Sequence, residues 1–206
     1  TMLGTPNSAV YPKWGAGIEM GVTGSLESSQ WLSPMGYAYL YGYVPGIVPA
    51  QGLKLSAMTQ VKLSSKSVFG MPAVNVMPRG MSKNTALLQQ LSIGNNVLTK
   101  VSADYAIPIY IGDISIAGGL VYIKRLTLTP HFDYMFVGRN NPAKVGLFSV
   151  GSALTLDLNG LIWINWPCSA GLSYSYNGGP SYNSFQEAYG IPLGRHYVGP
   201  VFNVSF

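Results

Sequence analysis

The chain has 206 residues, of which 9% are charged and 48% hydrophobic, with a mean hydropathy of +0.23 and a formal net charge of +5. A soluble globular domain carries about 25% charged residues, so this composition argues against a soluble enzyme domain and favours a membrane. The Lys and Arg residues are dispersed among carboxylates without a basic run, which disfavours nucleic-acid binding. No apolar stretch of about 18 residues is free of Gly, Pro and polar interruptions, so strands, closed into a barrel, would have to span the bilayer.

Three strands are predicted before residue 64, because side chains there alternate with the period of two that places them on opposite faces of a strand. Residues 14–22 set Trp, Ala, Ile, Met and Val against Gly and Glu. Residues 35–44 carry tyrosines at alternate positions, which would either form an interfacial girdle or fill the lumen. Residues 53–63 set Leu, Ala, Thr and Val against Lys, Ser, Met and Gln.

Five further strands follow from the same alternation. They are predicted at residues 97–107, 126–136, 148–158, 162–176 and 196–206. Residues 109–124 are expected to form a turn followed by an extension of the next strand, and residues 83–91 a short helix. Asn159-Gly160 is a hairpin signal. A two-residue loop would misalign the apolar faces, so we predict a three-residue or bulged turn that sets Leu158 opposite Ile162.

The remaining segments are predicted to connect the strands. They are residues 25–34, 45–50, 64–96, 138–145 and 177–195. Short and long connections alternate, as expected when turns lie on one side of a membrane and loops on the other. A soluble β-sandwich also alternates but predicts charged outer faces, whereas the polar faces here are rich in Gly, Ser, Ala and Thr. We therefore predict one all-β domain over residues 1–206, an antiparallel transmembrane β-barrel with about eight strands.

Four short stretches carry a family resemblance. Residues 76–81, Val-Met-Pro-Arg-Gly-Met, look like an Arg-Gly-aromatic motif with Met81 in place of the aromatic residue. Residues 101–109 look like the strand after that loop, with an acidic residue before Tyr and a Pro at its end. Residues 120–126 and the Phe-Asp element in residues 131–134 resemble the next strand. Together, in this order, they resemble the BamA/TamA-like outer-membrane barrel superfamily, especially the Bacteroidetes variant in which a TolB-like propeller precedes the barrel.

The resemblance implies a larger assembly and a function. The family barrel has about sixteen strands with five after the Arg-Gly loop, so three predicted strands before Arg79 and five after it make the chain the C-terminal half, with Thr1 on the periplasmic side. It implies a non-enzymatic bacterial outer-membrane protein that inserts proteins into that membrane or moves them across it. Expected partners are outer-membrane lipids and lipopolysaccharide, the barrel assembly machinery during biogenesis, and other outer-membrane proteins.

A second interpretation stays open. An eight-stranded chain is also a legitimate complete small barrel, which would act as a passive pore or structural anchor. Residues 1–12 carry neither a basic n-region nor an apolar h-region, so a leader would have been removed or the chain would be a piece of something longer.

The resemblance also singles out one polar site. In the family the Arg-Gly loop folds back into the lumen, and its Arg meets acidic residues of the neighbouring wall strands. Here Asp104 and Asp133 both fall on the polar faces of their predicted strands. We therefore expect Arg79 and Gly80 to approach these two carboxylates, where charge-assisted bonds would pin the loop inside the barrel. The alternative is a surface-loop Arg and two carboxylates that merely wet the lumen.

The last predicted strand carries a possible assembly signal. Val198, Phe202, Val204 and Phe206 alternate with polar positions up to the C-terminal residue. This spacing looks like the signal by which outer-membrane barrels are recognised by their assembly machine. A plain amphipathic edge strand would have the same pattern.

No catalytic residue, metal site or cofactor is predicted. The single cysteine, Cys168, falls on an apolar face and is expected to face lipid. His131 lies near Thr129 and Asp133 on one face, a conceivable relay, but neither a nucleophile elbow nor a suitably spaced Ser accompanies it. His196 opens the last strand and suggests neither catalysis nor metal binding.

Overall fold

A computed structural model describes most of the strand-forming chain. The described residues are 9–23, 34–64, 76–81, 87, 91, 95–116, 118, 121–137, 146–161, 168–179, 182–183, 187, 190 and 194–204.

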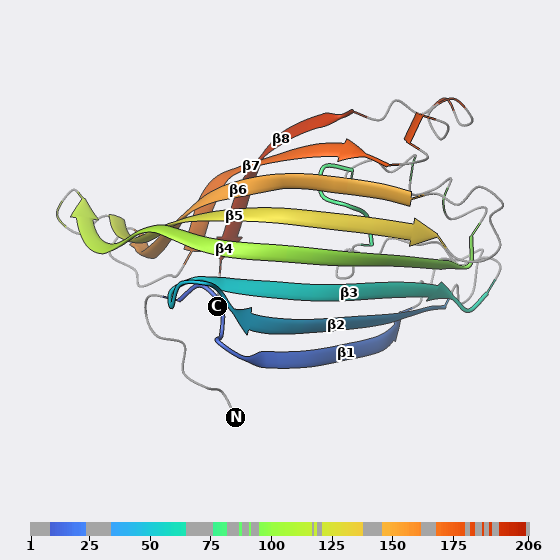
Figure 1. The fold of residues 1–206 in the computed structure, drawn as a ribbon, viewed down its shortest axis with the longest axis horizontal. Coiled ribbons are helices and arrows are strands. Elements are labelled where there is room, and N and C mark those ends of the chain that lie inside the picture. The colour runs from blue at the N-terminus through green and yellow to red at the C-terminus, as the bar shows by residue number, and fades with distance from the viewer. Residues whose placement is uncertain are drawn as a thin grey trace.

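The described residues form an all-β fold with eight antiparallel strands in one sheet, and each strand pairs with its neighbour in the sequence (Figure 1). The strands are β1 (Gly15–Thr23), β2 (Met35–Pro45), β3 (Gly52–Lys62), β4 (Val97–Ile116), β5 (Val121–Val137), β6 (Gly146–Leu161), β7 (Cys168–Gly178) and β8 (His196–Val204). The eight predicted strands and their antiparallel order are thus confirmed. Among the described residues β1 and β8 do not pair with each other, so the sheet has two free ends in its strand order.

The connections place long segments at one end of the sheet and short ones at the other. Segments 24–34, 63–96, 138–145 and 179–195 leave the end that we call the loop end. Segments 46–51, 117–120 and 162–167 connect strands at the opposite end, the turn end. The predicted alternation of short and long connections is confirmed. Within the predicted helix at residues 83–91, Leu87 and Leu91 have helical backbone. The other positions of this segment lie outside the described residues.

The prediction for residues 109–124 was wrong in its first half. β4 does not turn at residue 109 but continues to Ile116, and residues 117–120 make the connection. The reason is that β5 begins early, at Val121, and supplies a partner strand, as in the pair Ile114 and Ile123. Register shifts on either side of Tyr110 and Ile111 absorb the mismatch, as β-bulges do.

The hairpin predicted at Asn159-Gly160 is also corrected. β6 runs through these residues to Leu161, because β5 extends far enough to pair Tyr122 with Gly160. Leu158 lies opposite Cys168, and the predicted partner Ile162 lies outside the described residues. The requirement behind the prediction, that both apolar faces stay together, is nonetheless met, because Leu158 and Cys168 share a face.

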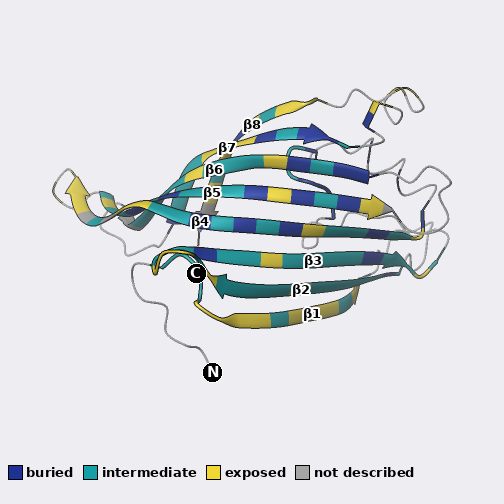
Figure 2. Ribbon diagram, in the orientation of Figure 1, coloured by how far each residue is buried: buried dark blue, intermediate teal, exposed yellow. Residues whose placement is uncertain are grey.

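The two faces of the sheet differ in chemistry, and buried and exposed residues follow one another along strands such as β5 (Figure 2). The inner face carries Asp104 and Asp133, and the outer face presents large apolar side chains that no described residue covers. The exposed apolar residues of the outer face include Ile18, Met20, Val22, Leu40, Leu55, Val101, Phe132, Val150, Leu154, Leu172, Val198 and Phe202. Apolar surface of this extent on a sheet face marks contact with lipid or another protein.

An apolar cluster fills the inner face at the loop end. Met77, Leu87 and Leu91 come from the segment between β3 and β4, and they pack with buried residues at the loop ends of β2, β4, β5 and β6. The wall residues of the cluster are Met35, Leu98, Met135 and Leu147, joined by Val76, Met81 and Tyr182. The described residues 76–81, Leu87 and Leu91 of the β3–β4 segment are therefore packed inside the curved sheet.

Candidate functional site

A row of short polar side chains forms the floor of the site. The strand register sets Ser102 opposite Asp133, Asp133 opposite Ser149, and Ser149 opposite Asn177. All four belong to the inner face and are buried. Because three of the four side chains are small and uncharged, the row leaves room for another backbone to lie across β4–β7. Residues 76–81 occupy that room, and Figure 1 draws them near β6 and β7.

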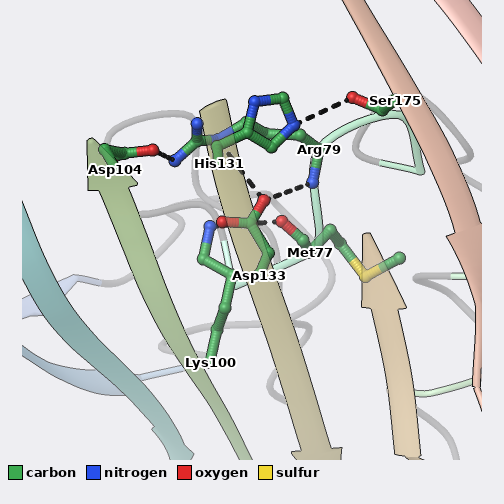
Figure 3. A network of polar contacts seen from close by, with 7 residues as sticks. All are labelled: Met77, Arg79, Lys100, Asp104, His131, Asp133 and Ser175. Carbon is green, nitrogen blue, oxygen red and sulfur yellow. Dashed lines mark hydrogen bonds and ion pairs between the residues drawn. The ribbon is translucent and has the colours of Figure 1, made fainter. Parts of the chain in front are cut away.

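Arg79 contacts both predicted carboxylates (Figure 3). Its Nη2 lies 2.5 Å from Asp104 Oδ1, and its Nε lies 3.3 Å from Asp133 Oδ2. Its backbone N–H also donates to Asp133 Oδ2 at 2.9 Å. The Asp133 side chain is 0% exposed and that of Arg79 is 38% exposed. A buried carboxylate is costly unless charge and hydrogen bonds compensate it, so Asp133 depends on Arg79.

Gly80 allows the segment to approach β7. Its φ of +84° lies in the left-handed region that side chains other than Gly rarely adopt. A Cβ at this position would lie 2.9 Å from both side-chain amide atoms of Asn177 and 3.2 Å from Ser175 Cβ. Conformation and space therefore both require glycine here. The four residues of the expected lock, Arg79, Gly80, Asp104 and Asp133, thus lie together in the structure.

Lys100 adds a further link between segment and wall. From β4 its Nζ donates to the carbonyl oxygen of Met77 at 3.2 Å (Figure 3). The cation therefore holds the residues just before Arg79 while it lies near the buried Asp133. Arg79 and Lys100 together counter the charges of Asp104 and Asp133, which is the condition for burying this many charges in one place.

Ser175 is a site residue that the sequence analysis missed. It lies on β7, and its Oγ is 3.1 Å from Nε2 of His131 on β5 (Figure 3). Gly151 of β6 lies opposite both residues, so no intervening side chain separates them. The available signal was that this histidine and this serine both lie opposite the same glycine. It could be recognised only once the strand register was known. The conceivable relay is not formed among the described residues, because His131 Nδ1 has no partner and the Asp133 carboxylate is engaged by Arg79.

A polar cavity of about 290 Å³ adjoins Arg79 on the β1 side. The tyrosines of β2 share a face with Asp104 through the strand register, so they line the inside of the sheet. Tyr37 donates a hydrogen bond to Glu19 at 3.1 Å, and Lys54 Nζ lies 5.9 Å from the ring centre of Tyr39. Besides Arg79 the cavity is lined by Glu19, Tyr39, Lys54, Ser56, Met58, Lys100, Ser102 and Asp104.

Tyr11 closes the inner face near the β2–β3 turn. Its ring centre is 5.5 Å from that of Tyr43, and Gly52 lies against its side chain. Burial, and after it the negative charge of Asp104, raises the pKa of the Tyr11 hydroxyl well above its ordinary value. Tyr11, which precedes β1, therefore lies against the inside of the sheet.

A second arginine–carboxylate pair lies on the same face toward the turn end. Arg125 of β5 and Asp157 of β6 are directly opposite each other. Arg125 Nε donates to Asp157 Oδ2 at 2.7 Å, and Nη2 lies 2.6 Å from the same oxygen. Unlike Arg79, Arg125 joins two strands that the backbone ladder already holds together.

The other singled-out residues lie apart from this site. Val198 and Phe202 of β8 point outward and are 68% and 66% exposed. Val204 belongs to β8, whereas Phe206 lies outside the described residues, so the assembly signal stays a prediction. Cys168 lies in register on the outer face but is only 8% exposed, which corrects the expectation that it lies open to lipid.

Comparisons with protein-family models, with characterised proteins and with solved structures find no match to this chain. In the described part of the chain, no three His, Cys, Asp or Glu side chains lie close enough to hold a metal ion. No helix among the described residues is long and apolar enough to cross a membrane.

Proposed function

We propose that the chain is part of an outer-membrane β-barrel of the BamA-like superfamily, and that it inserts proteins into the bacterial outer membrane or moves them across it. The observation that carries the proposal is the filled inner face. The described residues of the β3–β4 segment pack there in an apolar cluster, and Arg79 ties them to Asp104 and Asp133. The outward apolar side chains supply the surface that acyl chains would cover.

The same observation weighs against the rival function. A passive pore needs an open, water-filled lumen, whereas the loop end here is filled by side chains such as Met77, Leu87 and Leu91. In addition, β1 and β8 do not close an eight-stranded ring among the described residues. A plugged barrel fits a protein that acts on other proteins better than one that passes solutes.

Conductance across a planar bilayer tests the plug. The full chain should give a low, mostly closed conductance, and Arg79→Ala should open more often because it frees the segment from the wall. Arg125→Met is the matched control, because it removes an arginine of the inner face that holds no part of the segment. A large steady conductance of the unaltered protein would favour the passive pore.

The activity itself needs a second measurement. Vesicles that contain the purified chain should speed the folding of an unfolded outer-membrane barrel protein, compared with vesicles that lack it. The proposed activity forms no covalent intermediate, so His131→Ala should leave this folding rate unchanged. No acceleration at any ratio of protein to lipid would argue for the anchor role.

A further inference from the structure

The β4–β5 hairpin continues well beyond the end of β3. β4 has 20 residues, yet β3 pairs with it only from Val97 to Ala106. Residues 107–116 pair with β5 on one side, and no described strand pairs with their other edge. We call residues 107–128 the overhang, and Figure 1 shows it projecting past β3 at the turn end. At about 3.3 Å per residue, the free edge is roughly 30 Å long.

The overhang exposes apolar residues on both of its strands, and Figure 2 colours the β4 end of its tip as exposed. Ile109 is 57% exposed and Ile114 is 43% exposed. Tyr110, Ile116 and Tyr122 are exposed as well. A long apolar strand with an open edge is a template for pairing with another chain. The register shifts near Tyr110 and between Ile111 and Ile114 blunt only part of this edge, because Ile114 to Ile116 pair regularly with β5. We therefore expect the overhang to bind a partner.

Lipid does not supply the missing contacts. The free edge carries backbone N–H and C=O groups, for which hydrocarbon offers no hydrogen-bond partner. A tilted transmembrane strand needs about 9–11 residues, which β4 already supplies where it pairs with β3. The overhang therefore lies outside the hydrocarbon, at the end of short turns, which faces the periplasm in outer-membrane barrels.

Barrel closure does not cover the edge either. Strands that complete a ring would join β1 or β8, whereas this edge belongs to β4 in the middle of the strand order. The described N-terminal segment lies elsewhere, with Tyr11 against Gly52 on the inner face. A second copy related by a two-fold axis along the membrane normal would set each N–H opposite its own symmetry mate, which forms no ladder.

We propose that the free edge of β4 in the overhang binds an extended segment of a separate periplasmic protein, which adds as a strand in line with β3. Main-chain hydrogen bonds supply the affinity, and alternate apolar side chains of the partner pack beside Ile114 and Ile116. The inference rests on the proposed position in the membrane, because that position puts the overhang in water.

A model strand tests the edge directly. The probe is a fluorescent peptide of about eight residues with alternating Val and Thr, long enough to form a strand, added to the full chain in detergent. Its anisotropy should rise to saturation. The same peptide with N-methyl groups along both edges has no N–H to donate to the ladder and should bind about tenfold more weakly. Equal binding of both peptides would overturn the proposal.

Two lysine substitutions separate the edge from general stickiness. Ile114→Lys puts a charge on the free edge strand and should weaken peptide binding about tenfold. Tyr122→Lys makes a comparable change on β5, which is paired on both sides at that residue, and should change binding less than about twofold. Equal losses in the two variants would mean that the apolar surface, and not the backbone edge, binds the peptide.

Quenching by brominated lipids distinguishes a failure of this inference from a failure of the proposed function. Single dyes are attached at Leu40→Cys on the wall and Ile116→Cys on the overhang, in a Cys168→Ser background. Quenching at position 40 alone supports both ideas. Quenching at both positions puts the overhang in the bilayer and overturns the partner site alone, and quenching at neither overturns the membrane assignment on which both depend.

Discussion

Two arginines on the inner face, each paired with carboxylate side chains, differ in what they hold together. Arg79 comes from the segment between β3 and β4, and it reaches Asp104 and Asp133 on two wall strands. Arg125 lies opposite Asp157, where the backbone ladder between β5 and β6 already fixes both residues. The first pair decides whether a segment stays inside the sheet, whereas the second only adds to a contact that would exist without it.

Burial sharpens this difference. Asp133 is completely buried and receives the backbone N–H of Arg79 as well as its side chain, so it has little access to water if Arg79 is lost. The side chain of Asp157 is 21% exposed, so water can replace part of its pairing. Removing an arginine should therefore cost far more at position 79 than at position 125.

The largest effect is expected for Arg79→Ala. It removes the guanidinium that contacts the buried Asp133 carboxylate and leaves Lys100 as the nearby cation, which should lower the free energy of unfolding by about 3 kcal/mol. Denaturant unfolding in detergent measures this loss, and limited proteolysis should cut residues 76–81 sooner than in the parent. Arg79→Lys keeps the positive charge but not the forked set of guanidinium donors. Its free energy of unfolding should therefore lie between those of the parent and of Arg79→Ala. Unchanged stability and unchanged cleavage would mean that the pair does not hold the segment.

Gly80→Ala should come next, at about 2 kcal/mol, because it combines a left-handed backbone conformation with a close approach to Asn177. The double variant with Asn177→Ala relieves the crowding but not the backbone strain. It should therefore recover part of the loss in the same unfolding measurement. Full recovery of stability would assign the whole loss to crowding against Asn177. No recovery would assign it to the strained backbone conformation at position 80.

Arg125→Met should cost about 1 kcal/mol, because the ladder between β5 and β6 persists and the partly exposed Asp157 can be hydrated. Proteolysis of residues 76–81 should proceed at the parental rate. Faster cleavage there would show that the two pairs are coupled, contrary to the distinction drawn between them.

The smallest effect is expected for Ser175→Ala. It removes one buried hydrogen bond to His131 and should cost roughly 1 kcal/mol or less. The NMR signals of the His131 ring should shift while those of residues 76–81 stay in place. A loss as large as that of Arg79→Ala would give the histidine–serine contact a part in the lock that the geometry does not indicate.

The predicted half of the site rested on alternation and on the resemblance. Alternation along each strand predicts that Asp104 and Asp133 lie on the polar faces. The Arg-Gly motif predicts that Arg79 approaches them. Ser175 could not be found in this way, because its contact with His131 depends on which residues of β5, β6 and β7 lie opposite one another. The glycine at position 151, between them, has meaning only once that register is known.

The strands and the chemistry of their faces followed from the sequence by itself, because a side chain's face is decided by its nearest neighbours along the chain. Where β4 and β6 end, which row Asp133 shares, and how far the overhang extends were decided by the tertiary structure. A strand continues as long as an adjacent strand offers hydrogen-bond partners, and that strand belongs to a different part of the sequence. For this reason Asn159-Gly160, a local turn signal, lies inside β6 beside the early start of β5.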